Sequence, residues 1–324
     1  MKYNWQQVDP QLRLLGKLMK WFNPSFTENR LRFASTFGRM FWVQLKDKAI
    51  SQSVDIIQRR DGTLMNIFIY KPTKVDSFLP GVLWMHGGGY AIGHPGQSRF
   101  FAKKLIEASP CIVFSVDYRL STQSTYPAAL HDCYDALLWM KNQASHLGVR
   151  SDQIMIGGDS AGGGLCAALS LYARDKKEVS IAFQMPLYPM IDDRMQTNSA
   201  KNNHAPVWDS LSSYYGWKLY LGDLFETMNV PEYAAASRSK NYANLPPTLT
   251  YIGDLEPFRD ETIAYVYQLN KAGNTVFFKE FSGCYHAFEQ MVPKAKISIK
   301  AHDFLMNGFA YAVNHFTLKQ PDSH

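Results

Sequence analysis

The stretch IGGDSAGGGL, residues 156–165, places five glycines around one serine and constrains the fold more than any other segment. Glycine inside a helix costs roughly 0.5–1 kcal/mol relative to alanine, so this cluster needs a structural reason. The apolar run QIMI precedes it and LCAALSLYAR follows it, which predicts a buried strand, a sharp turn at Ser160 and then a helix. Side chains at Gly158 and Gly162 would collide with the neighbouring strand or helix. The pattern Gly158-x-Ser160-x-Gly162 is typical of a nucleophile elbow.

The pattern alone is a weak signal, because it occurs by chance in roughly one chain in ten of this length. A serine hydroxyl is also a poor nucleophile at neutral pH. It needs a base that accepts its proton, an acid that orients the base, and donors for the negative oxygen that forms. The rest of the sequence must therefore supply three partners for Ser160.

After residue 50 the chain alternates between strand-like and helix-like segments. The predicted strands are 54–59, 64–70, 81–86, 111–116, 153–158, 181–188, 247–253 and 275–281. The predicted helices lie near 97–108, 127–147, 161–174, 258–272 and 294–315. Asp61-Gly62 between the first two strands indicates a hairpin. A leading hairpin followed by β–α alternation predicts an α/β fold with one mostly parallel, eight-stranded sheet flanked by helices.

The base should be a histidine on a late loop, and His286 in FSGCYHAF directly follows the last predicted strand. Gly283 permits a tight turn between that strand and the histidine. The other histidines with loop or helix-surface positions lack such a setting. We therefore expect His286 to serve Ser160 as its base.

The orienting acid should follow the preceding strand, where the chain reads YIGDLEPFRDE. Three carboxylates compete there: Asp254, Glu256 and Asp260. Pro257 favours an extended conformation at Glu256, which suits a loop residue that reaches across to His286. Asp260 is expected in the first turn of the next helix, where the helix dipole favours a negative charge. The residues alone do not decide between Glu256 and Asp254.

Backbone N–H groups should bind the negative oxygen. The segment WMHGGGYAIG, residues 84–93, follows a buried strand, and its successive glycines let the main chain approach a ligand closely. Together with the N–H of Ala161, directly after the nucleophile, this loop predicts an oxyanion hole. Its spacing matches no phosphate-binding loop. His86 is expected to fix the loop by hydrogen bonding, because no second ligand is spaced to join it at a metal.

The chain order is thus HGGG, Ser160, a carboxylate and His286, which is the order of the α/β-hydrolases. The sequence resembles their hormone-sensitive-lipase-like group, which includes many bacterial carboxylesterases. The matching segments are HGGGY (86–90), DYRL (117–120), YPAALHD (126–132), GGDSAGG (157–163), EPFRDE (256–261) and YHAF (285–288). The resemblance covers about residues 80–290 and implies an α/β-hydrolase fold with a helical cap.

The resemblance also implies a role for each site residue. They are Ser160 as nucleophile, Glu256 as acid, His286 as base, and Gly88, Gly89 and Ala161 as oxyanion donors. The group usually has aspartate where this chain has Glu256, so Asp254 stays a rival. A second departure, STQST where Ala-Pro usually follows DYRL, predicts a changed loop. No cofactor and no metal is implied.

Two regions interrupt the alternation: residues 1–50 and roughly residues 190–244. We expect 1–50 to form N-terminal cap helices and 51–324 the α/β-hydrolase catalytic domain, with a cap insertion near 190–244 that packs against those helices. Residues 1–50 hold nine Lys and Arg against three Asp and Glu, a balance of +6. A basic, aromatic segment of this kind also fits a membrane surface, and that alternative stays open.

Composition narrows the class of protein. A hydrophobic content of 46% and an aromatic content of 14% predict a full core. No apolar run approaches the ~20 residues of a membrane span, and no signal peptide is recognised, so no stable membrane insertion is expected. Four widely spaced cysteines without C-x-x-C indicate reduced thiols and a cytoplasmic location. No nucleic-acid motif accompanies the basic segment.

These observations predict a serine carboxylesterase that hydrolyses small-molecule acyl esters through an acyl-enzyme, and the resemblance favours short acyl chains. One alternative keeps the chemistry but changes the substrate to an amide, a carbamate or an acetylated sugar. Another is a ligand receptor on the hydrolase fold, as in the plant gibberellin receptors. Such a receptor typically lacks a triad member, whereas this chain has a serine, an acid and a histidine. The sequence does not decide between a monomer and a homodimer.

Overall fold

One sheet runs through the molecule in the computed structural model, which describes residues 4–22, 25–38, 49–74 and 77–321. Within these residues it has eight strands in the order β1-β2-β4-β3-β5-β6-β7-β8. The strands are β1 (Ile50–Gln58), β2 (Leu64–Pro72), β3 (Leu79–Met85), β4 (Ile112–Val116), β5 (Val149–Asp159), β6 (Phe183–Leu187), β7 (Thr248–Gly253) and β8 (Val276–Phe281). β2 pairs antiparallel with β1 and β4, and all later pairs are parallel, which confirms the predicted hairpin and the mostly parallel sheet.

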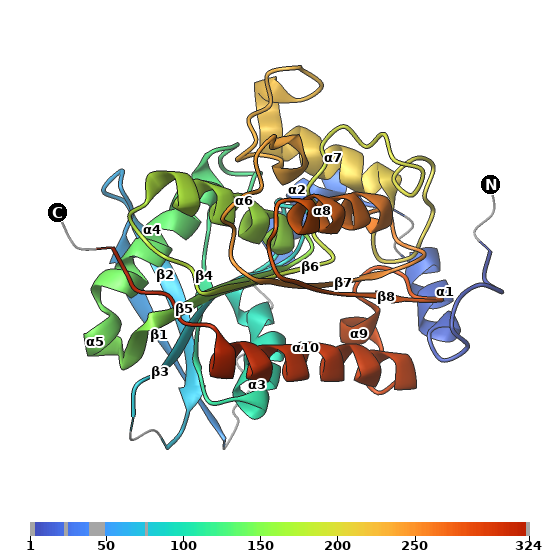
Figure 1. Ribbon diagram of the computed structural model, residues 1–324. Helices are drawn as coiled ribbons and strands as arrows, with labels where there is room; N and C mark the ends of the chain where they lie inside the picture. Colours follow the sequence, from blue (N-terminus) through green and yellow to red (C-terminus); the bar gives the residue numbers. More distant parts are fainter. Residues whose placement is uncertain (1–3, 23–24, 39–48, 75–76, 322–324) are drawn as a thin grey trace.

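Helices cover both faces of this sheet. In the described chain they are α1 (Arg13–Phe22), α2 (Glu28–Gly38), α3 (Arg99–Ala108), α4 (Ala128–Asn142), α5 (Ala144–Leu147), α6 (Ala161–Lys176), α7 (Ser210–Leu221), α8 (Arg259–Lys271), α9 (Phe288–Met291) and α10 (Lys296–His315). Helices α3 and α10 lie on one side of the sheet, and α6 and α8 lie on the other (Figure 1). Strands β3, β4, β6 and β7 are consequently buried along their whole length, as their uninterrupted apolar runs predict.

The main differences from the predicted elements are two strand starts and one divided helix. β1 begins at Ile50, four residues before its predicted start. β5 begins at Val149, four residues before the predicted start, and pairs there with Leu79 ahead of a register shift. The polar residues RSD, 150–152, follow Val149, so the first residues of β5 lack the apolar pattern by which a buried strand is recognised. The predicted helix 127–147 is two helices, α4 and α5, with Gln143 between them. Gly148 then ends α5 in the left-handed conformation, at φ 74°.

The first helices and the insertion at 190–244 meet at the start of α7. Asp209 accepts a hydrogen bond from the backbone N–H of Ser212 (3.0 Å) and so caps α7. Its other oxygen accepts from Lys20 Nζ (2.9 Å) and Ser25 Oγ (2.6 Å), both from the N-terminal segment. The backbone N–H of Phe26 donates to Ser212 Oγ (2.9 Å). Burial opposes ionisation of Asp209, but these hydrogen bonds outweigh it and lower the pKa of its carboxyl.

Candidate active site

Ser160 stands on the sharp turn between β5 and α6. Its φ of 57° and ψ of −119° lie where side chains other than glycine are strained. A Cβ on Gly158 would overlap the carbonyl of Gly162 and lie 2.8 Å from the Met85 oxygen. A Cβ on Gly162 would lie 2.6 Å from the His86 oxygen. Both collisions predicted for this turn are therefore confirmed, and the turn aims the serine out of the backbone.

The three side chains predicted to form the catalytic triad are connected by hydrogen bonds. His286, on the loop after β8, has its Nε2 2.9 Å from Ser160 Oγ. Its Nδ1 lies 2.5 Å from Oε2 of Glu256, which follows β7. The other oxygen of Glu256 accepts from the backbone N–H of Gly253 at 3.0 Å. With a proton on Nδ1 donated to the carboxylate, Nε2 is free to accept the serine proton, and all three side chains are buried.

Asp254 has a different position from Glu256. One of its oxygens accepts hydrogen bonds from two backbone N–H groups of the histidine loop, those of Gly283 (2.7 Å) and of the next residue (3.2 Å). The other oxygen accepts from Ser282 Oγ at 2.8 Å. Asp254 thus holds the loop that carries His286, whereas Glu256 contacts the imidazole itself. Of the two carboxylates between which the sequence does not decide, these contacts favour Glu256 as the acid that orients His286.

The glycine loop lies against the nucleophile turn. A Cβ built on Gly87 would lie 3.3 Å from Ser160 Cβ. Gly88 and Gly89 have φ of 123° and 58°, which glycine adopts without strain. In the described chain the backbone N–H groups of Gly88 and Gly89 donate to no protein acceptor, and neither does that of Ala161 in the first turn of α6. These three N–H groups, which the sequence predicts as oxyanion donors, are therefore available to hydrogen-bond a ligand.

The insertion and the N-terminal segment both contact the surroundings of this site. A Cβ on Gly89 would overlap the ring of Trp208, and one on Gly216 of α7 would lie 3.1 Å from the Gly89 oxygen. On the other side, the hydroxyl of Tyr285, next to the histidine, donates to the carbonyl of Leu12 at 3.2 Å. Segments far apart in the sequence are thus packed against the glycine loop and the histidine loop.

Comparison with known proteins agrees with the geometry of this site. The family model described as alpha/beta hydrolase fold matches residues 82–290, which include the glycine loop, Ser160, Glu256 and His286. The chain belongs to the α/β hydrolase fold family. Within it, this hydrolase is a member of the hormone-sensitive-lipase-like carboxylesterase group and a carboxylic ester hydrolase.

Several relatives of this hydrolase are named esterases. An arylesterase of Saccharolobus solfataricus is 32% identical over 242 residues, which are 74% of this chain and 78% of that protein. Esterase LipI of Mycobacterium tuberculosis is 35% identical over 220 residues, or 65% of this chain and 67% of that protein. Among solved structures, a bacterial heroin esterase superimposes with a TM-score of 0.87 and 32% identity, covering 95% of this chain and 99% of its own.

Sequence reasoning missed a buried polar layer behind the histidine of this hydrolase. Tyr188 donates to Glu289 Oε1 (2.6 Å), and Gln290 Nε2 donates to the Tyr188 hydroxyl (2.8 Å) and to Asp159 Oδ2 (3.3 Å). The Tyr188 ring meets the His286 ring edge-on, with centroids 5.1 Å apart. Burial raises the pKa of Asp159 to about 6 and that of Glu289 to about 7. The glutamate three residues after the histidine was the available signal, but nothing in its spacing indicates burial.

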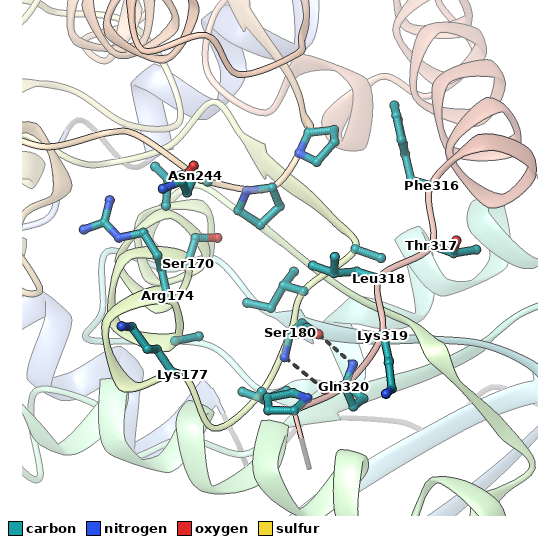
Figure 2. Close-up of a pocket in the computed structure, with 18 residues that line it drawn as sticks. Ser170, Arg174, Lys177, Ser180, Asn244, Phe316, Thr317, Leu318, Lys319 and Gln320 are labelled. Atoms are coloured by element: carbon teal, nitrogen blue, oxygen red, sulfur yellow. Dashed lines mark hydrogen bonds between the residues drawn. The ribbon is translucent and has the colours of Figure 1, made fainter.

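A pocket of about 640 Å³ lies beside the amino ends of β6 and β7, and Figure 2 shows the residues that line it. It is lined by the end of α6, by the segments that lead into β6 and β7, and by residues 316–321. The backbone N–H of Ser180 donates to Gln320 Oε1, and Gln320 Nε2 donates to the Ser180 carbonyl, both at 2.9 Å. Since Ser160 follows the carboxyl end of β5, this pocket is remote from the candidate site.

The described residues lack the features of a metal site and of a membrane span. No group of three or more His, Cys, Asp or Glu there could hold a metal ion. All four cysteines are described, buried and unpaired. No described helix is long and apolar enough to cross a membrane.

Proposed function

We propose that this hydrolase cleaves small-molecule carboxylic esters through an acyl-enzyme on Ser160. His286 is the general base, Glu256 orients it, and the N–H groups of Gly88, Gly89 and Ala161 bind the oxyanion. The observation that carries the proposal is the buried hydrogen-bonded line from Glu256 through His286 to the serine hydroxyl.

The reaction follows in two halves. His286 Nε2 takes the proton of Ser160 as Oγ bonds to the ester carbonyl carbon, and the oxygen that becomes negative is bound by the backbone donors. The carbon–alkoxide bond then breaks, and the imidazolium gives its proton to the leaving alcohol. In the second half His286 takes a proton from water as the water oxygen bonds to the acyl carbon. The carbon–Oγ bond then breaks, the imidazolium returns the proton to Ser160 Oγ, and the carboxylic acid leaves. Glu256 stabilises the imidazolium in both halves.

We infer a preference for short acyl chains. Support comes from the ring of Trp208, which is 4% exposed and packs directly on Gly89, where a long chain would need room. A similar protein of Pseudomonas putida, 27% identical over 72% of this chain, is named ethyl acetate hydrolase. Both grounds favour a small acyl group next to the oxyanion donors.

The surroundings of the site support two further parts of the proposal. We infer that residues 1–50 and the insertion at 190–244 act together as the cap, on the strength of the contacts of Asp209 with Lys20 and Ser25. The described part of that pair of segments packs against Gly89 and Tyr285. We also propose a cytoplasmic location, since four buried, unpaired thiols suit a reducing compartment.

The test is a series of para-nitrophenyl esters from acetate to dodecanoate, with wild type and Ser160→Ala. We expect kcat/KM to be highest at the short end and Ser160→Ala to lose activity by a factor of about 10⁴ or more. Wild type should also release a burst of one nitrophenol per active site when deacylation is slow. A Ser160→Ala protein with near wild-type turnover would refute the assignment of the nucleophile. A maximum at dodecanoate would refute the inferred chain length alone.

A further inference from the structure

Helix α1 has one face on the protein and one face in solvent. Its inner side packs at Gly16, where a Cβ would lie 3.0 Å from the rings of both Trp5 and Tyr285. The outer side carries four apolar residues whose exposed fractions are high: Leu14 (72%), Leu18 (43%), Trp21 (76%) and Phe22 (74%). Their spacing of four, seven and eight residues from the first places them on one side of the helix. The helix lies at the rim of the molecule (Figure 1).

The charges of α1 are all of one sign. It contains Arg13, Lys17 and Lys20 and no acidic residue. Lys20 is held by Asp209, whereas Lys17 is exposed at the edge of the apolar face, three residues after Leu14, with its Nζ 5.9 Å from the centroid of the Trp5 ring. The outer face therefore combines large apolar side chains with an exposed cation.

Helix α2 carries a second pair of exposed aromatic side chains a few residues later. Phe33 and Phe37 are 66% and 44% exposed, and their ring centroids lie 4.6 Å apart. Arg30 and Arg32 are exposed on the same helix, where Arg32 pairs with Glu28 at 3.1 Å. The N-terminal segment thus presents two exposed aromatic pairs, each accompanied by basic side chains.

We propose that the outer face of α1 docks the protein on an anionic lipid surface, with the helix lying in the plane of the interface. Amphipathic helices that bind this way carry Trp, Phe and Leu on one face and Lys or Arg beside them. A helix of ten residues is about 15 Å long, half the hydrocarbon thickness of a bilayer, so it lies on the surface and does not span it.

Charge favours a lipid surface over a second copy of the chain as the occupant. A two-fold dimer through this face would bring the same patch of each copy together and place like charges around Lys17 in an apolar contact. Anionic headgroups would instead attract the lysine while the acyl boundary takes up Leu14, Trp21 and Phe22. The docking is independent of the ester chemistry proposed above.

The experiment measures co-sedimentation of the full chain with vesicles of equal parts phosphatidylcholine and phosphatidylglycerol, and with phosphatidylcholine alone. We expect wild type to bind the anionic vesicles more strongly and to lose affinity as salt rises. Trp21→Ser/Phe22→Ser should weaken binding roughly tenfold or more, because the two largest exposed rings are removed. The matched control is Tyr267→Ser/Ile299→Ser, which removes apolar side chains with exposed fractions of 62% and 47% on α8 and α10. It should bind like wild type.

Lys17→Glu provides a second variant that keeps the apolar face intact. It should lose roughly fivefold or more on anionic vesicles and change little on phosphatidylcholine. Circular dichroism and the melting temperature check that each variant folds. Absence of wild-type binding, or equal loss in the α8/α10 control, would overturn the proposal. So would a wild-type dimer in light scattering that the Trp21→Ser/Phe22→Ser variant converts to monomer, since a second copy would then cover this face.

Discussion

Replacing Glu256 by glutamine and, separately, Asp254 by asparagine tests which carboxylate orients His286. The two substitutions are matched, since each removes one negative charge and keeps the side-chain shape. Their surroundings differ: Glu256 Oε2 lies 2.5 Å from His286 Nδ1, whereas Asp254 accepts from backbone N–H groups of the loop at 2.7 and 3.2 Å. An amide oxygen can still accept those backbone hydrogen bonds, but a neutral amide cannot stabilise an imidazolium.

The expected magnitudes follow from these contacts. Glu256→Gln should lower kcat by a factor of about 10⁴, the loss seen when the acid of a serine–histidine–acid triad loses its charge. Asp254→Asn should lower kcat by less than about tenfold. It should instead cost roughly 1–2 kcal/mol of folding free energy, because the two backbone hydrogen bonds and the one from Ser282 Oγ lose their charged acceptor.

Steady-state kinetics on para-nitrophenyl acetate and thermal unfolding of both variants give the two readouts. We expect a large kcat loss with little change in melting temperature for Glu256→Gln, and the reverse pattern for Asp254→Asn. An Asp254→Asn enzyme as slow as Glu256→Gln, at a temperature where both are folded, would refute the reasoning. So would a Glu256→Gln enzyme that keeps more than about a tenth of wild-type kcat.

Three further predictions concern the oxyanion loop, the cap contact and the buried carboxyl. Gly89→Ala should lower kcat by about 10²-fold, since its Cβ overlaps the Trp208 ring, whereas Gly273→Ala, with similar φ and no atom within 4 Å, should leave kcat unchanged. Asp209→Asn should lower the free energy of unfolding by about 1–3 kcal/mol at neutral pH. The difference from wild type should shrink as pH falls, because the pKa of Asp209 is lowered in the folded state and protonation removes the stabilisation that its carboxylate gives wild type. Glu289→Gln should become more stable relative to wild type as pH rises, because burial raises the pKa of Glu289 from 4.5 to about 7 and its ionisation then destabilises the folded wild type. In urea unfolding, the free energy of unfolding of the variant minus that of wild type should increase by roughly 3 kcal/mol between pH 4.5 and 8. A difference that stays constant over this pH range would contradict the prediction.

The sheet could be predicted because its central strands are buried on both faces and read as short apolar runs between glycine and proline. The meeting of the three candidate side chains could be predicted for a related reason. Ser160, Glu256 and His286 each follow a parallel strand, and the carboxyl ends of parallel strands meet at one edge of the sheet. The position of a residue directly after a parallel strand therefore predicts which other residues lie near it, whereas amino-acid composition does not.

What the sequence did not decide depends on contacts within or across loops. Asp254 and Glu256 are two residues apart on one loop, and the direction of each side chain depends on where the histidine loop packs. The ion pair of Lys20 with Asp209 joins residues 189 positions apart. The burial of Glu289 depends on Tyr188 from β6's end, 101 positions away. No local pattern contains such information, because each contact is fixed by the packing of elements already formed.

The two glycine-rich motifs are better understood as one packing unit than as two signals. A Cβ on Gly158 or Gly162 would meet the carbonyls of Met85 and His86, the residues that lead into the HGGG loop. The backbone of that loop can approach the serine turn only because these positions have no side chains. The approach of the Gly88 and Gly89 backbone, the predicted oxyanion donors, to Ser160 therefore depends on Gly158 and Gly162. Their density around the serine, costly in an ordinary helix, follows from the requirement that two backbones meet at the nucleophile.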